Sequence, residues 1–259
     1  MPLKRIERPD LGLVWYEFDR PGLRNGLLTR LGGTSQGPFA GLNLGSTVGD
    51  SLAAVASNHA RVFAAFGLRR SDVVSPHQVH GRRVAAVSAD DGGTVIAETD
   101  ALITAQPGLA LLLRFADCTP VLLYDPVRHV AGLAHAGWRG VVAGVVPEAV
   151  HALTTQFGTA PADLWAGIGP TIGHDHYAVG ADVVDAVRAT LPPHSSVASR
   201  VGEEWHLDLP EAVSAQLRMV GVTTIERSGF CTACRTEEWY SHRAEGGNTG
   251  RFGVVAVLG

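Results

Sequence analysis

The chain has 259 residues, of which 46% are hydrophobic and 18% charged, and its formal net charge is -4. This composition is too apolar for a disordered protein, and three cysteines are too few for a disulfide scaffold. The weak negative charge gives no general reason to bind nucleic acid, and the sequence shows neither a signal peptide nor a membrane span. We therefore expect a cytoplasmic monomer with one domain spanning residues 1–259.

Short apolar runs bounded by turn residues predict buried strands along the chain. In chain order they cover residues 73–74, 84–87, 101–103, 109–113, 121–124, 130–134, 164–168 and 254–258. Helical patterns lie between them: one helix from the N-cap Ser51 to about Phe66, one over 140–157, one over 182–191 and one capped by Asp208. Pro147 either kinks the second helix or marks its true first turn. Frequent strands and helices together predict an α/β or α+β domain of layered sheets.

Two of these strands bring together residues that can bind a metal. Cys118 precedes strand 121–124, and His135 follows strand 130–134, with a turn at residues 125–129 between them. An antiparallel hairpin would return the end of the second strand to the start of the first, so Cys118 and His135 would be neighbours. His80 precedes strand 84–87 and joins them if those strands are adjacent. Three such ligands leave a fourth position open, which is typical of catalytic zinc.

Other polar positions are candidates for binding or redox chemistry. The segment from Gly137 to Gly140 leads into the predicted helix over 140–157, where backbone N–H groups and Arg139 could bind an anion. A glycine-rich segment over residues 26–50 could cradle a ligand through Arg30 and Asn43, although it matches neither a dinucleotide fingerprint nor a P-loop. The Cys-x-x-Cys pair at residues 231–234 is interpreted as two reduced thiols near a pocket.

Taken together, these segments resemble the laccase-domain family, also called multicopper polyphenol oxidoreductase or YfiH-like proteins. The matching residues run along nearly the whole chain and keep the order of the family's motifs. They include Thr29-Arg30-x-Gly32-Gly33, Leu42-Asn43-Leu44-Gly45, His77-Gln78-Val79-His80-Gly81, Thr99-Asp100-Ala101, Ala116-Asp117-Cys118-x-Pro120, His135-Ala136-Gly137-Trp138-Arg139-Gly140, Cys231-Thr232 and Ser241-His242-Arg243.

The resemblance implies an α/β/β/α layered fold and one zinc held by His80, Cys118 and His135. It also implies purine nucleoside phosphorylase activity on adenosine, inosine, guanosine or methylthioadenosine, together with adenosine deaminase activity. The implied partners are a purine nucleoside and phosphate, with phosphate near Arg139 or Arg30. The predicted site adds Asp117 to the three metal ligands as a catalytic residue, and its substrate-binding residues are Arg30, Asn43, Gln78, Arg139 and Arg243.

Two other activities remain open from the same resemblance. One is an editing hydrolase that removes a misplaced amino acid from a cell-wall muropeptide precursor. The other is copper-dependent oxidation of polyphenols, the older label of the family. Multicopper oxidases build their copper cluster from several His-x-His pairs, and this chain has only one, at His174 and His176. A single Cys/His/His set suits zinc better than copper. A metal-stabilised interaction domain without catalytic activity is the non-enzymatic alternative.

Overall fold

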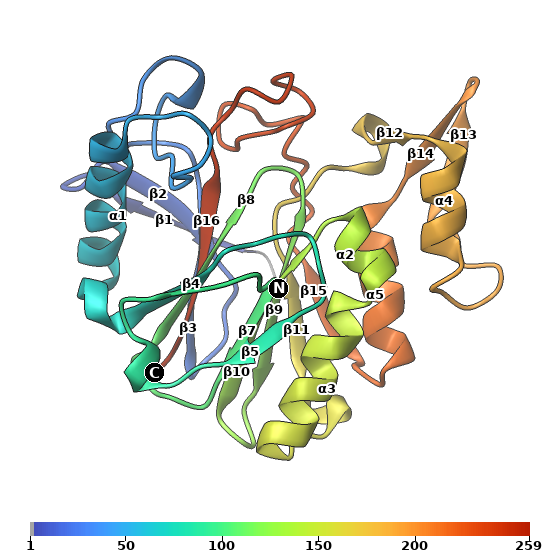
Figure 1. Cartoon of the computed structure of the whole chain (residues 1–259), viewed down its shortest axis with the longest axis horizontal. Coiled ribbons are helices and arrows are strands. Elements are labelled where there is room, and N and C mark those ends of the chain that lie inside the picture. The colour runs from blue at the N-terminus through green and yellow to red at the C-terminus, as the bar shows by residue number, and fades with distance from the viewer. Residues whose placement is uncertain (1–2) are drawn as a thin grey trace.

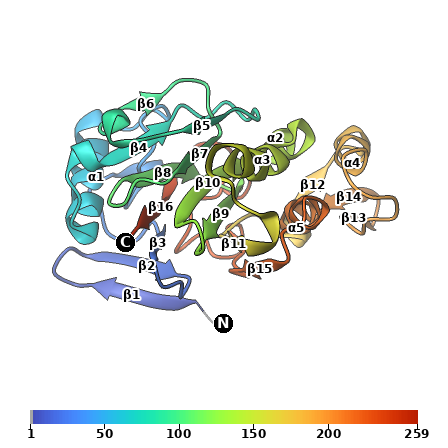
Figure 2. The same cartoon turned by 90° about the horizontal axis from the view of Figure 1, so that it is seen from below.

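The computed structural model describes residues 3–259 as two stacked sheets with helices on both outer faces (Figures 1 and 2). In this part of the chain the first sheet has seven strands in the order β1-β2-β3-β16-β8-β4-β6. Their bounds are β1 Lys4–Arg8, β2 Leu13–Glu17, β3 Leu23–Leu28, β4 Val73–Pro76, β6 Val95–Ile96, β8 Ala110–Phe115 and β16 Phe252–Leu258.

The second sheet carries the predicted hairpin at its centre. Its six strands, again within the described residues, follow the order β15-β11-β9-β10-β7-β5. Their bounds are β5 Val84–Ala86, β7 Ala101–Thr104, β9 Thr119–Asp125, β10 Val130–Ala136, β11 Trp165–Ile168 and β15 Thr224–Arg227. Strands β9 and β10 are antiparallel and in register from Val130 opposite Asp125 to Ala136 opposite Thr119.

Helix α1 (Leu52–Phe66) covers the outer face of the first sheet, and α3 (Val145–Phe157) and α5 (Leu209–Met219) cover the outer face of the second (Figure 2). At the periphery, α4 (Ala181–Arg188) accompanies a small sheet of β12 (Ala178–Val179), β14 (Glu204–Leu207) and β13 (Ala198–Val201). This is the α/β/β/α arrangement implied by the resemblance. Helix α2 (Trp138–Ala143) completes the helical layer on the second sheet.

Period-2 alternation along the central strands produces the layers. In β8, Leu111 and Leu113 point between the two sheets, whereas Leu112 faces α1. In β9, Leu122 lies between the sheets and Leu123 faces the helices. Strands with both faces buried need apolar residues at successive positions, which explains the continuous apolar runs in the sequence.

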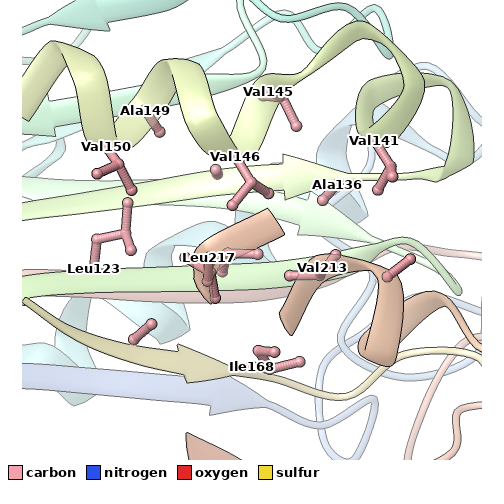
Figure 3. Packing of buried hydrophobic residues seen from close by; sticks show 14 of the residues in the cluster. Leu123, Ala136, Val141, Val145, Val146, Ala149, Val150, Ile168, Val213 and Leu217 are labelled. Carbon is pink, nitrogen blue, oxygen red and sulfur yellow. The ribbon is translucent and has the colours of Figure 1, made fainter. Parts of the chain in front are cut away.

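The helical side of the core is shown in Figure 3, where α3 and α5 pack on the second sheet. Val150 of α3 points towards Leu123 of β9, and both belong with Val146, Ala149 and Leu217 of α5 to one buried cluster. None of the helices in residues 3–259 combines the length and apolar character that a membrane crossing requires.

The helix starts and ends confirm some predictions and correct others. Ser51 accepts the N-cap hydrogen bond of α1, and Asp208 does so for α5, as their sequences predict. The single helix predicted over 140–157 is instead two helices, because Gly144 adopts a φ of 85° and separates α2 from α3. Pro147 therefore lies in the first turn of α3, where its missing N–H leaves no bond unmade. The helix predicted over 182–191 is the shorter α4.

Candidate active site

Three candidate metal ligands come together where the β9–β10 hairpin opens. Cys118 directly precedes β9, and His135 is opposite Pro120 near the end of β10. The expectation that His135 follows its strand is wrong by two residues, since β10 extends to Ala136. The predicted proximity is nevertheless confirmed: the ligand atoms of His80, Cys118 and His135 all lie within 4.8 Å of one another.

His80 joins this pair through a loop and not through a neighbouring strand. Strand β5, which follows His80, is separated from β10 by β7. The loop is held by the buried carboxylate of Asp100, which accepts hydrogen bonds from the backbone N–H groups of His80 at 2.9 Å and Gly81 at 2.7 Å. His80 has a φ of 61°, a conformation uncommon for a residue other than glycine. Backbone hydrogen bonds to Asp100 hold it there.

Asp100 also orients the second histidine. Its Oδ1 atom lies 2.9 Å from Nδ1 of His135, and both side chains are buried. A histidine that donates through Nδ1 presents Nε2 as the ligand atom, an arrangement common in metal sites. Sequence reasoning quoted Asp100 only within a motif and gave it no role, because its contacts with His80 and His135 span distant segments.

Because Gly137 has no side chain, there is room beside it for the thiol of Cys118. A Cβ atom at this position would be 2.7 Å from Sγ of Cys118 and 3.2 Å from Cδ2 of His80. The rings of His80 and His135 meet edge to face, with their centroids 4.8 Å apart. Any side chain at residue 137 would therefore push into the candidate ligands.

The site favours the ligand form of the thiol. Burial raises the pKa of Cys118, but the adjacent His135 and His80 outweigh burial and lower it to about 6. Burial lowers the pKa of His135, while Cys118 and Asp100 raise it more, so it lies above its ordinary value. Thiolate is the form of cysteine that binds metals. One thiolate sulfur and two imidazole nitrogens match the donors of zinc sites with an open position, so the residues present fit a zinc ion.

The three ligands line a pocket of about 720 Å³. This volume falls in the range of small-molecule sites. The rest of the lining is largely polar and positively charged, with three aromatic side chains, Phe115, Trp138 and Tyr177. Its arginines are Arg114, Arg139, Arg243 and Arg251.

Two of these arginines were missed by sequence reasoning. Arg114 directly follows the predicted strand 109–113 and lies on β8, and Arg251 precedes the predicted strand 254–258 and lies directly before β16; neither was given a role in the site. Burial lowers the pKa of each guanidinium from its ordinary value, but arginine remains charged in proteins. The signal that could have found them is a charged residue within or beside an otherwise apolar strand.

The predicted substrate-binding residues divide into two groups. Gln78, Arg139 and Arg243 line the pocket. Arg30 and Asn43 do not: the Arg30 guanidinium bonds Glu245 at 2.8 Å, and buried Asn43 bonds Asp50 at 2.8 Å. The geometry thus gives Arg30 and Asn43 structural partners and does not support the predicted ligand contacts.

Among the pocket residues, Gln78 and Arg139 differ in how free their side chains are. The amide of Gln78 is occupied at both ends by the backbone of Arg114, at 2.8 Å and 3.0 Å. The exposed Arg139 guanidinium stacks on Trp138 with 4.3 Å to the ring centroid. It has no carboxylate partner among residues 3–259. The Arg139 side chain is therefore freer than that of Gln78 to bind an anion.

Asp117 lies beside the site, with both carboxylate oxygens occupied. Oδ1 accepts from the hydroxyl of Thr232 at 2.6 Å, and Oδ2 accepts from the backbone N–H of Arg243 at 2.7 Å. Its φ of 80° turns the chain so that Cys118 enters the pocket. These contacts give Asp117 a part in shaping the site, and a catalytic role for it stays a prediction.

The predicted anion site at the start of a long helix needs correction. Helix α2 has only six residues, so its aligned dipole is short. An anion bound at this end of the pocket would therefore rely on the side chain of Arg139 and its neighbouring arginines, not on a helix over 140–157.

Comparisons with known proteins place this chain in a family. The family profile described as "Multi-copper polyphenol oxidoreductase laccase" matches residues 24–259. The chain belongs to this family. A relative from Geobacillus stearothermophilus, named purine nucleoside phosphorylase YlmD, is 41% identical over 95% of this chain and 94% of its own. A purine nucleoside phosphorylase of Mycobacterium bovis is 40% identical over 98% of both chains.

Solved structures of the family have the same fold. The crystal structure of YlmD from Geobacillus stearothermophilus superposes with a TM-score of 0.91 at 37% identity and covers 94% of this chain. YfiH from Bacillus licheniformis gives a TM-score of 0.91 at 34% identity over 96% of this chain. The family is metal-associated by its description, and the His/Cys/His group is where this member could hold a metal.

Proposed function

We propose that this member of the family is a metal-dependent purine nucleoside phosphorylase, with zinc bound by His80, Cys118 and His135. Its substrates would be adenosine, inosine, guanosine or methylthioadenosine together with phosphate. The observation that carries the proposal is the His80/Cys118/His135 group, which opens into a pocket lined by arginines. The names of relatives about 40% identical to this chain support the same activity.

Phosphorolysis places a specific demand on the pocket. A phosphate oxygen forms a bond to C1′ of the ribose, the bond from C1′ to the purine nitrogen breaks, and the base leaves with a proton from solvent. Phosphate carries about two negative charges at neutral pH, so it must be bound by cations. Arg139 has a free guanidinium at the pocket wall, and the charges of Arg114, Arg243 and Arg251 add to the positive field.

The remaining lining suits the nucleoside. Trp138 and Tyr177 offer aromatic surface against which a purine base can pack. Burial and the charge of Cys118 raise the pKa of Tyr177, so its hydroxyl stays protonated and can donate a hydrogen bond. Zinc would supply a Lewis acid that polarises an oxygen of the substrate or of water. Adenosine deamination, in which water replaces the amino group and ammonia leaves, would use the same pocket.

One experiment separates this proposal from its alternatives. The zinc-loaded protein is incubated with adenosine, with and without phosphate, and in parallel with a serine-bearing muropeptide precursor, and the products are separated by chromatography. We expect adenine release that requires phosphate, and its loss in His80→Ala, Cys118→Ala and His135→Ala. Amino-acid release without adenine release would replace the phosphorylase with the editing hydrolase. Full activity in the three variants would refute the metal centre.

Copper oxidation of polyphenols is less consistent with the donor groups. Among residues 3–259 the structure has one further His/Cys group that could hold a metal, at His176, Cys231 and Cys234. Neither group contains the several histidines that a cluster of copper ions requires. Metal analysis of the protein tests this point, and copper with oxidase activity would overturn the assignment of zinc.

A further inference from the structure

We propose that His176, Cys231 and Cys234 form a second metal site, which binds a thiophilic divalent cation such as zinc. The sequence interpretation treated Cys231 and Cys234 as two reduced thiols near a pocket. The structure adds a histidine to that pair from a segment more than fifty residues earlier in the chain. This proposal does not depend on the proposed phosphorylase activity.

Sheet topology explains why these segments meet. Strands β11 and β15 are parallel neighbours, so the segments that follow them emerge at the same edge of the second sheet. A parallel bridge between Thr171 and Cys231 extends this pairing beyond the strands. His176 lies in the short 3-10 helix His174–His176 that follows β11, and the cysteines lie in the turns that follow β15. The three side chains are thus brought together by paired backbone.

The positions of the ligand atoms are close to those of a zinc site. Nε2 of His176 lies 3.2 Å from Sγ of Cys234, and all three ligand atoms lie within 4.8 Å of one another. Zinc–sulfur and zinc–nitrogen bonds at tetrahedral angles would place neighbouring ligand atoms roughly 3.3 to 3.8 Å apart. Only small side-chain movements are needed to reach that geometry.

The surroundings of Cys231 support a thiolate ligand. The backbone N–H of Gly173 donates to Sγ of Cys231 at 3.2 Å, and such bonds stabilise sulfur ligands in metal sites. A Cβ atom on residue 173 would lie 3.2 Å from both Cβ and Sγ of Cys231, so a glycine permits this close approach. His176 and Cys234 are exposed, which gives an ion a path from solvent and leaves a fourth position for water or the nearby Asp175.

The donor set selects the class of metal. Two sulfurs and one imidazole nitrogen favour zinc and other thiophilic ions over magnesium or calcium, which prefer oxygen ligands. All three cysteines of the chain are free thiols in the structure, so no disulfide competes for these two.

A metal at this second site would fix the wall of the first. Tyr177, which follows His176, lines the pocket, and the backbone oxygen of Ala178 accepts from the guanidinium of Arg243 at 2.8 Å. On the other side, Thr232 bonds Asp117, the residue before Cys118. The second metal would cross-link the two loops that carry these contacts. We therefore assign it a structural role beside the pocket.

Metal content of the reduced protein tests the proposal. The chain is purified with a thiol reductant, dialysed against zinc and then against metal-free buffer, and analysed by mass spectrometry of the elements. We expect about two zinc ions per chain in the wild-type protein. The content should fall to about one in Cys118→Ala, which lacks only the first site. It should also fall to about one in the double variant Cys231→Ser, Cys234→Ser, which lacks only the second site. Cobalt titration of Cys118→Ala should still give a thiolate charge-transfer absorption band.

His176→Gln provides a milder variant, and His174→Gln is its matched control. Both histidines are in the same 3-10 helix, but Nε2 of His174 bonds Ser199 at 2.8 Å, and His174 does not belong to the group of residues around the cysteines that could hold a metal. We expect His176→Gln to bind zinc more weakly at the second site and His174→Gln to retain about two ions. About one ion in the wild-type protein, unchanged when both cysteines are replaced, would overturn the proposal. A disulfide between Cys231 and Cys234 in the reduced preparation would overturn it as well.

Discussion

The carboxylate of Asp100 bonds Nδ1 of His135 at 2.9 Å while its two oxygens also accept backbone N–H groups from residues 79–81. One buried side chain thus fixes the loop of His80 and the ring of His135. Burial raises the pKa of Asp100, but hydrogen bonds and the charge of His135 outweigh burial. The pKa therefore lies below its ordinary value, and the carboxylate is ionised. The site is positioned by a residue that does not belong to the ligand trio.

Replacing Asp100 by asparagine should weaken metal binding. An amide has one acceptor oxygen in place of two, and its NH2 group would face N–H donors, so both histidines would lose part of their support. We expect the zinc affinity of the first site to fall about 10- to 100-fold. Competition with a chelating dye measures this zinc affinity in a protein whose Cys231 and Cys234 have both been replaced by serine. The exposed Asp90 supplies the control Asp90→Asn, and equal affinity in both variants would contradict the role of Asp100.

Gly137→Ala should disrupt the ligand cluster with little change elsewhere. The added methyl group would meet Sγ of Cys118 at 2.7 Å, so thiol or backbone must move. We expect loss of zinc from the first site. Gly144→Ala is the contrasting variant, because its Cβ meets nothing within 4 Å but its φ is +85°. It should cost about 1 to 2 kcal/mol of unfolding free energy and leave zinc binding intact. Retained zinc in Gly137→Ala would show that the pocket tolerates a side chain there.

Arg139→Gln and Arg30→Gln should have opposite effects. Arg139 has a free guanidinium in the pocket, so its loss removes a charge-assisted contact worth about 1.5 kcal/mol or more to an anion. We expect KM for phosphate to rise about tenfold with little change in Tm. Arg30 bonds Glu245 and stacks on Tyr240 at 4.2 Å, so its loss should lower Tm and leave KM unchanged. A raised KM for phosphate in Arg30→Gln, with an unchanged KM in Arg139→Gln, would instead support Arg30 as the phosphate ligand.

His59 should make the protein less stable in mild acid. Burial, together with the charges of Arg114 and Arg70, lowers its pKa from 6.5 to about 4, and its Nε2 bonds the carbonyl of Leu44 at 3.1 Å. Between these pH values the unfolded chain takes up the proton more readily than the folded one. The free energy of unfolding should therefore fall as pH drops from 6.5 towards 4, by at most about 3 kcal/mol.

The matched variants for this prediction are His59→Gln and His151→Gln. Glutamine can still donate to Leu44 but does not titrate, so the slope of stability against pH should decrease in His59→Gln. His151 is exposed on α3, and its replacement should leave the slope unchanged. Urea unfolding at a series of pH values measures both. An unaltered slope in His59→Gln would assign the acid sensitivity to other groups.

Local sequence was sufficient for the elements whose signals lie within a few residues. The caps Ser51 and Asp208 hydrogen-bond the first turns of their own helices, and the turn at residues 125–129 joins strands that pair directly. Because Cys118 and His135 flank that hairpin, their proximity followed from the sequence. The boundary at Gly144 was missed because a glycine with positive φ ends one helix and begins another only when tertiary packing favours the break.

Periodicity and hairpin geometry are local properties, so the sequence by itself predicted a layered α/β or α+β domain and the proximity of Cys118 and His135. It placed His80 with them only on the condition of adjacent strands and through the family resemblance. Only the tertiary structure decided that Asp100 supports the site, that Arg114 and Arg251 reach the pocket while Arg30 does not, and that His176 lies beside Cys234. These relationships depend on which strands are neighbours in the sheets. Strand order is set by burial of the whole core, which no short segment of sequence encodes.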